Sequence, residues 1–201
     1  MDRRDFLYSS VGLGTVSLVM SASLTGTTQA ETLQTTQSPP SQEKPKMNTD
    51  KPILIAADPF AVALKDAITA HLKGKDYQII DLGATTTHEV PYYDGAVAVC
   101  RAIQAGQADR GILFCGTGMG MSVIANRFRG VVAAVVESVF AAQMSRTINN
   151  ANVLCLGSMI WGEWMAKEAV DTFLNTQFTE GLEPLSDFLR DAEKKVNAIR
   201  D

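Results

Sequence analysis

The segment GILFCGTGMG, residues 111–120, joins a short apolar run to a glycine-rich turn and is the stretch that decides the fold. Its first four residues are apolar, which is typical of a buried strand. The glycines let the backbone turn sharply and lie close to a ligand, and residues 121–128 have the pattern of a helix whose first N–H groups face the same space. The sequence therefore predicts Cys115 at the carboxyl end of a strand, beside a loop that can hold an anion.

A thiol in this setting suits proton transfer. A helix N-terminus favours negative charge, so it would stabilise a thiolate at Cys115 and an oxyanion forming on a substrate. A free cysteine at a strand end is also often just a small buried apolar residue. A Gly-x-Gly loop can instead hold the pyrophosphate of a dinucleotide, and Glu137 lies where a ribose-binding acid would. The spacing disfavours this, because Gly120 follows Gly118 by two positions where the fingerprint has three.

The rest of the domain alternates apolar runs with helical periodicity. Strands, expected to be covered on both faces, are predicted at residues 52–57, 77–81, 111–114, 131–136 and 152–156. Helices are predicted at residues 60–72, 92–105, 121–128, 139–146 and 162–173. This alternation indicates an α/β fold with a doubly wound, Rossmann-like, five-stranded parallel sheet. Ligands bind beyond the carboxyl ends of such strands, where Asp58, Cys115 and Glu137 with Ser138 fall.

A further helix is predicted at residues 184–200. Its apolar stripe consists of Phe188, Ala192, Val196 and Ile199. A stripe of this kind packs either on its own domain or on a second subunit, and the sequence favours neither.

The first fifty residues differ in composition from the rest. Residues 1–30 have the pattern of a twin-arginine signal peptide, with Arg3-Arg4, an apolar stretch at residues 11–24 and a small-residue cleavage site ending at Ala30. The apolar stretch is too short and weak to span a membrane. Residues 31–50 are polar and proline-containing, as in a flexible linker, and residues 51–201 form the domain. We expect export to the periplasm, or a cytoplasmic protein if Met47 is the true start.

Composition limits the partners. A formal net charge of −4 gives no reason to expect nucleic acid or an anionic membrane surface. Three cysteines do not make a disulfide framework, and the two histidines and scattered acids show no metal-ligand spacing. The sequence thus predicts no metal and no other cofactor. Cys100 and Cys155 are expected as buried apolar residues, and Cys115 as a free thiol.

The motifs resemble one known family. Asp58, the segment CGTGMG at 115–120, the segment SRTINNANV at 145–153 and Gly157-Ser158 are similar to the type B ribose-5-phosphate isomerases, which include the galactose-6-phosphate isomerase subunits. The resemblance covers residues 53–178. It implies an aldose–ketose isomerase in which Cys115 shuttles a proton between adjacent carbons through a cis-enediolate.

The resemblance also assigns roles to the loop and to the quaternary structure. The enediolate oxygen would be stabilised, and the substrate held, by Gly116, Thr117, Gly118, Met119 and Gly120, and Asn149 matches a sugar-binding residue. Active sites of the family lie between two subunits, so a homodimer or a tetramer of dimers is expected, with a small sugar as the substrate.

Several positions depart from the family pattern. Pro59 stands where a histidine is usual, and Ile148 stands at the position of the ring-opening histidine. Leu182 and Glu183 occupy a phosphate-binding segment, and neither can hold a dianion. These changes favour an isomerase or epimerase for an unphosphorylated or already open-chain sugar. The alternatives are a conventional sugar-phosphate isomerase and a non-catalytic sugar-binding subunit.

Other polar and aromatic residues carry smaller expectations. Asp58 would bind sugar hydroxyls or position a proton, or else cap the following helix. Tyr92 and Tyr93 would contact substrate or pack in the core, and His88 would replace a missing acid/base or lie unused in a loop. His71 is expected to be structural. Arg146 would face a neighbouring subunit or an anionic substrate, or else serve as a cation at the C-terminus of its helix. Packing at a subunit contact is expected for Trp161, Trp164 and Met165.

Overall fold

The structure is a computed structural model that describes residues 51–199. The predictions made for residues 1–50, namely the signal peptide with cleavage after Ala30, the linker and the alternative start at Met47, lie outside the described residues.

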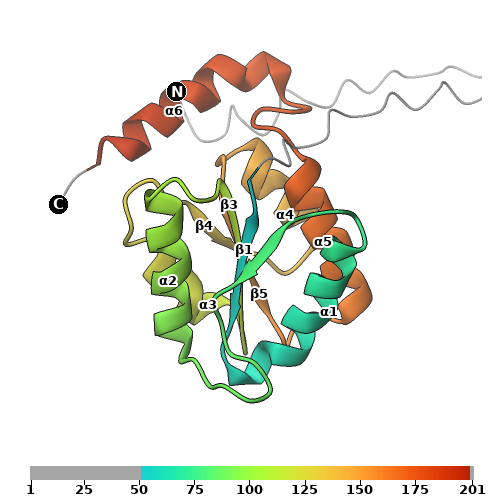
Figure 1. The fold of residues 1–201 in the computed structure, drawn as a ribbon. Helices are drawn as coiled ribbons and strands as arrows, with labels where there is room; N and C mark the ends of the chain where they lie inside the picture. The colour runs from blue at the N-terminus through green and yellow to red at the C-terminus, as the bar shows by residue number, and fades with distance from the viewer. Residues whose placement is uncertain (1–50, 200–201) are drawn as a thin grey trace, which may run out of the picture. The chain divides into compact units, whose positions relative to one another are not determined.

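A parallel sheet forms the centre of the domain, with strands in the order β2-β1-β3-β5-β4 (Figure 1). The strands are β1 (Ile53–Ala57), β2 (Ile79–Asp81), β3 (Arg110–Cys115), β4 (Ala133–Val135) and β5 (Val153–Gly157). β1 and β5 are fully buried and β3 nearly so, because their residues are apolar on both faces. The predicted doubly wound α/β fold is confirmed.

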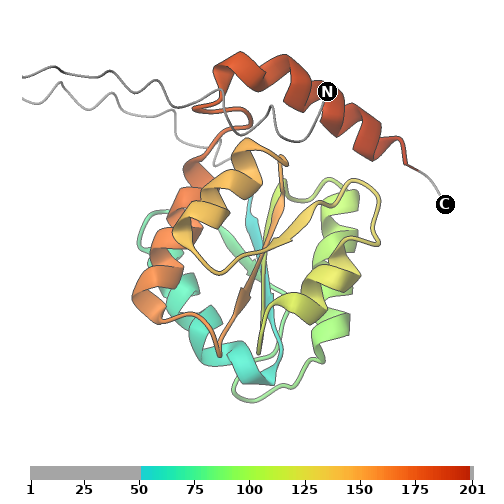
Figure 2. The same ribbon diagram turned by 180° about the vertical axis from the view of Figure 1, so that it is seen from behind.

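Two layers of helices cover the sheet (Figures 1 and 2). The helices are the short 3-10 turn η1 (Pro59–Ala61), then α1 (Val62–Lys73), α2 (Tyr92–Gln104), α3 (Met119–Ala125), α4 (Val139–Thr147), α5 (Glu163–Asn175), the 3-10 turn η2 (Glu183–Leu185) and α6 (Ser186–Asn197). Buried residues of α1, α4 and α5 form one core cluster against the sheet. Those of α2 and α3 form the other, which also contains all three cysteines.

Three sequence predictions need correction. The edge strands β2 and β4 are partly exposed, since each has a neighbour on one side only. Both are also shorter than predicted. The predicted first helix begins as a 3-10 turn, because Pro59 fits the first position and the Asp58 carboxylate accepts a hydrogen bond from the N–H of Phe60 at 3.0 Å. α3 begins at Met119, two residues earlier than expected, and ends by Ala125.

α6 lies across the end of the sheet at which the strands begin (Figure 1). Of its residues only Leu189 is buried, while Phe188 is 68% exposed and Val196 is 60% exposed. Ala192 is half-buried, so most but not all of the predicted apolar stripe is left exposed on this chain. No helix within residues 51–199 is long and apolar enough to cross a membrane.

Candidate active site

Cys115 is the last residue of β3 and is only 6% exposed. Its Sγ accepts a hydrogen bond from the backbone N–H of Gly118 at 3.1 Å. This contact forms because the loop folds back over the strand end, with Gly118 in the left-handed conformation at φ 77°. A backbone N–H aimed at sulfur is a favourable partner for that atom, so the loop holds the Cys115 sulfur in one position at the strand end.

Close backbone packing keeps the loop in place. A Cβ on Gly157, at the end of β5, would lie 2.6 Å from the carbonyl carbon of Thr117. A Cβ on Gly118 would lie 3.1 Å from the carbonyl oxygen of Cys155. The N–H of Ser158 donates to the carbonyl of Cys115 at 2.9 Å. The loop after β3 is therefore pressed against the end of β5, where only glycine leaves room.

Aromatic and thioether side chains border the loop. A Cβ on Gly120 would lie 3.0 Å from the ring of Tyr92, so Tyr92 lies directly against the loop. Tyr92 also packs edge-on with Tyr93 at 5.3 Å between ring centroids, and both rings are partly exposed. Met159, which the sequence analysis did not single out, faces Gly116 with its methyl 3.3 Å from a Cβ built there. The structure thus brings the predicted Tyr92 to the loop.

Asp58 follows β1 and lies beside Cys115, because Ala57 and Phe114 are paired in the register of β1 and β3. It is buried, and burial raises the pKa of its carboxyl, although hydrogen bonds from Phe60 and Ala61 oppose the rise. The same carboxylate caps η1. The capping interpretation of Asp58 therefore holds.

An ion pair made by a buried lysine supports this corner of the domain and was missed in the sequence. Lys65 of α1 is fully buried and pairs with Asp81 at the end of β2. Asp81 also accepts a hydrogen bond from the N–H of Gly83 at 3.0 Å. A Cβ on Gly83 would lie 2.2 Å from the backbone nitrogen of Ala57, so the pair supports the loop after β2 where it lies against the end of β1. A lysine within a helical pattern gives no signal of such burial.

Asn149 lies at the opposite end of the domain from Cys115. It is exposed in the turn between α4 and β5, and it lines a cavity of about 190 Å³ beneath α6 together with Ile148. β5 separates the two ends, and five residues of strand span about 16 Å. A single chain therefore does not bring Asn149 to the thiol.

Arg146 is a structural cation at the end of α4, since it is only 2% exposed. Its guanidinium donates to Asn150 Oδ1 at 2.8 Å, to the carbonyl of Ala151 at 2.6 Å and to the carbonyl of Thr176 at 3.3 Å. Burial, with Arg110 nearby, lowers its pKa to about 10, and Glu193 opposes the shift. Of the interpretations considered for Arg146, the helix-end role fits the structure.

The other candidates lie away from the thiol or are unavailable to a ligand. His88 is in an exposed loop, where its backbone bonds to Thr85. His71 pairs with Asp171 at 2.9 Å, as expected of a structural residue. Trp161 is buried and donates to the carbonyl of Val136 at 2.8 Å, which confirms its packing role. Trp164 is 86% exposed on this chain, so its expected packing at a subunit contact stays a prediction.

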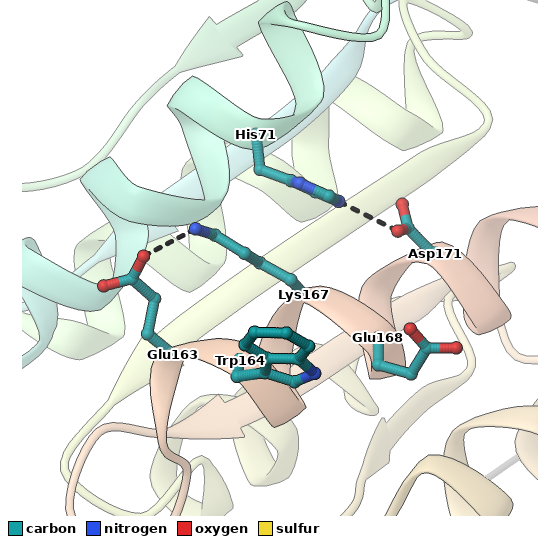
Figure 3. Close-up of a pocket in the computed structure, with 6 residues that line it drawn as sticks. All are labelled: His71, Glu163, Trp164, Lys167, Glu168 and Asp171. Carbon is teal, nitrogen blue, oxygen red and sulfur yellow. Dashed lines mark hydrogen bonds and ion pairs between the residues drawn. The ribbon is translucent and has the colours of Figure 1, made fainter.

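The largest of the cavities described, about 510 Å³, lies between α1 and α5 (Figure 3). The paired side chains His71–Asp171 and Lys167–Glu163, the latter at 2.5 Å, line it beside the indole of Trp164. Its lining has three carboxylates, on Glu163, Glu168 and Asp171, against one lysine and one histidine, and it contains no residue of the thiol loop. We therefore assign it no part in catalysis.

The three cysteines differ in environment. All are free thiols. Burial raises the pKa of Cys100 to about 12 and the pKa of Cys155 well above its usual value, so both stay protonated in neutral solution. Among residues 51–199 no group of three or more histidine, cysteine or acidic side chains is placed to hold a metal ion. Of the three, Cys115 alone has a backbone donor on its sulfur and lies at the carboxyl edge of the sheet.

Comparisons with known proteins bear on this arrangement of a thiol, a glycine loop and a parallel sheet. The profile of the Ribose/Galactose Isomerase family matches residues 53–185. The 4-deoxy-4-sulfo-D-erythrose isomerase of Clostridium sp. (strain MSTE9) is 42% identical over 151 residues, which cover 74% of this chain and 95% of that protein. The D-erythrulose-4-phosphate isomerase of Pectobacterium atrosepticum is 40% identical over 130 residues, covering 64% of this chain and 86% of that protein.

Solved structures agree with the sequence comparison. The ribose 5-phosphate isomerase of Thermotoga maritima superposes with a TM-score of 0.67 at 37% identity, covering 75% of this chain and 99% of that one. Fold and site define a sugar isomerase that interconverts aldoses and ketoses. The chain belongs to the ribose/galactose isomerase family.

Proposed function

We propose that this isomerase acts on a short, open-chain sugar whose terminal carbon carries no phosphate, with a four-carbon sugar capped at C4 as the best candidate. The observation behind this is Ile148, an apolar side chain at the position where the resemblance places the ring-opening histidine. Loss of that acid/base is harmless only if the substrate needs no ring opening.

Four-carbon sugars blocked at C4 meet this condition. A furanose forms when the C4 hydroxyl attacks C1, and a tetrose without a free C4 hydroxyl would have to close a strained four-membered ring instead. Both relatives described above are named for substrates of this kind, one with a sulfo group on C4 and one with a phosphate. The sulfo sugar suits this chain better, because a sulfonate carries one charge where a phosphate carries nearly two, and Leu182 and Glu183 offer no cation.

In the proposed reaction the Cys115 thiolate removes the proton from C2 of the aldose. The electrons of the C2–H bond form a C1–C2 double bond, and those of the C1 carbonyl move to O1. Backbone N–H groups of residues 116–120 and the Thr117 hydroxyl stabilise this enediolate oxygen. The buried Asp58 transfers the O2 proton to O1, and the thiol returns its proton to C1, which leaves the carbonyl at C2.

The proposed active form is a homodimer in which a second copy supplies Asn149. Support comes from the separation of Asn149 and Cys115 across about 16 Å of β5, because a four-carbon sugar is far shorter than that. The exposed stripe of α6, next to Asn149, offers apolar surface for such a contact. A larger assembly built from such dimers remains compatible with this arrangement.

Solvent deuterium incorporation tests the chemistry directly. Purified protein is incubated in D₂O with D-erythrose, D-erythrose 4-phosphate, 4-deoxy-4-sulfo-D-erythrose, D-ribose and D-ribose 5-phosphate, and exchange beside the carbonyl is followed by NMR. We expect fastest exchange with the sulfo sugar. A preference for ribose 5-phosphate would support the conventional sugar-phosphate alternative, and absence of exchange with every sugar would support a binding subunit.

Export remains part of the proposal and depends on the twin-arginine pattern at residues 2–7. Fusion of residues 1–50 to a reporter that works only in the periplasm checks it, with Arg3→Lys/Arg4→Lys as the matched control. A reporter that stays active with both arginines replaced would contradict a twin-arginine route.

A further inference from the structure

The turn that holds Asn149 is fixed by a chain of side-chain hydrogen bonds ending on α6. Arg146 Nη1 donates to Asn150 Oδ1 at 2.8 Å, and Asn150 Nδ2 donates to Glu193 Oε1 at 2.7 Å. Asn150 has φ 49°, a conformation that asparagine tolerates better than most residues. The residue next to Asn149 is therefore held by a buried cation on one side and by a helix from the end of the chain on the other.

Only an amide satisfies both contacts of Asn150. Its oxygen must accept from a guanidinium and its nitrogen must donate to a carboxylate. An aspartate at 150 could still pair with Arg146, but its second oxygen would face the carboxylate of Glu193. The two partners together specify both the residue type and the orientation of its side chain.

α6 has few other attachments to the domain. Leu189 is its buried residue, and Arg190 lies over the ring of Phe178 at 5.4 Å from the centroid. Phe188 and Val196 are exposed, and Ala192 is half-buried. The hydrogen bond from Asn150 to Glu193 thus connects α6 to the turn, so a shift of α6 would move the turn.

We propose that Glu193 is a positioning residue: through Asn150 it fixes the backbone of Asn149, so that α6 controls how well the substrate is bound. This rests on the proposed function, in which Asn149 contacts the sugar. Glu193 touches no substrate, and the proton-transfer chemistry at Cys115 does not depend on it. Weakening the link therefore raises KM and leaves kcat nearly unchanged.

An exchange of functional groups provides the sharpest test. Asn150→Asp places two carboxylates face to face and should raise KM about tenfold or more, the effect expected for losing a hydrogen bond to a charged group. Glu193→Gln alone keeps an oxygen acceptor and should change KM little. Combining Asn150→Asp with Glu193→Gln restores a donor opposite an acceptor, so KM should return to within about threefold of wild type.

Asp191→Ala is the matched control. Asp191 is also an α6 carboxylate, but it pairs only with Lys195 within the helix, at 2.7 Å. Deuterium exchange of backbone amides at residues 149–152 gives a second readout that needs no substrate. It should speed up in Asn150→Asp and return to normal in the double variant, while Asp191→Ala should leave it unchanged.

The outcomes separate the two proposals. A wild-type protein that turns over none of the sugars rejects the proposed function, whatever the amide exchange shows. An active wild type in which Asn150→Asp lowers kcat instead of raising KM rejects the positioning role of Glu193. Failure of Glu193→Gln to rescue Asn150→Asp, by KM and by amide exchange, also rejects it.

Discussion

The two ends of the sheet are held by different forces. At the carboxyl end, the loop around Cys115 is fixed by backbone packed against backbone, as at Gly157 and Thr117. At the amino end, the turn around Asn149 is fixed by side chains, with Arg146, Asn150 and Glu193 in one chain of hydrogen bonds.

This difference has consequences for chemistry and binding. A donor held by tight packing has little freedom to move, which suits an oxyanion that must be met in one geometry. A turn held by side chains can change by single substitutions that leave the backbone intact. We expect residues at the carboxyl end of the sheet to carry out the proton transfer, and residues at the amino end to determine which substrate is bound.

Removing the thiol should have the largest effect. Cys115→Ala is expected to lower isomerisation and deuterium exchange by about 100- to 10,000-fold, because the base is lost. Cys100→Ala deletes the same atoms from a thiol outside the site and should stay active. Both rates are measured by NMR in D₂O; an active Cys115→Ala protein would mean that another group moves the proton.

Adding a side-chain atom at the carboxyl end of the sheet should have the next largest effect. Gly157→Ala forces a Cβ to 2.6 Å from the Thr117 backbone and should lower the free energy of unfolding by about 1–3 kcal/mol. Gly74→Ala meets its nearest atom at 3.4 Å and is expected to be neutral or slightly stabilising. Urea denaturation compares the two, and equal stabilities would refute tight packing as the force that holds the loop.

Aspartate substitutions in the apolar stripe of α6 test the amino end of the sheet. Phe188→Asp and Val196→Asp alter exposed side chains, so each should leave the folding of one chain intact while weakening the proposed dimer. We expect a shift to monomer by light scattering and about a tenfold loss in kcat/KM, corresponding to about 1.4 kcal/mol. Lys194→Ala, on the same helix, serves as control. A dimer that survives both aspartates would place the subunit contact elsewhere.

The effect that is smallest near neutral pH is a dependence of stability on alkaline pH. The folded protein keeps Cys100 and Cys155 protonated where unfolded thiols ionise, near a pKa of about 8.5. The native state then binds more protons, so stability falls as pH rises above about 9, by at most about 1.4 kcal/mol per pH unit for each thiol. Unfolding measured from pH 8 to 11 should show this slope, and Cys100→Ala should reduce it.

Sequence patterns predicted the fold well because its signals are local. Each central strand is a short apolar run and each helix has its own periodicity, so alternation alone indicated the parallel sheet. The edge strands were overextended because an apolar run does not reveal which strand lacks a neighbour. The thiol loop was found for the same local reason, since Cys115 and its glycines are contiguous.

Contacts between residues far apart in the chain could not be predicted from the sequence. Lys65 and Asp81 are sixteen positions apart, and Asn150 and Glu193 are forty-three apart. Neither pair belongs to a periodic pattern, because their meeting depends on how helices dock. The stripe of α6 was recognised, but whether it packs on its own domain depends on the docking angle of the helix, which no residue type encodes.

The separation of Cys115 and Asn149 to opposite ends of the sheet also has a genetic meaning. In a homodimer of the proposed kind, each site takes one residue from each copy. Two defective alleles, one lacking the thiol and one lacking the amide, would then complement each other, because half of the sites in a mixed dimer would contain neither defect.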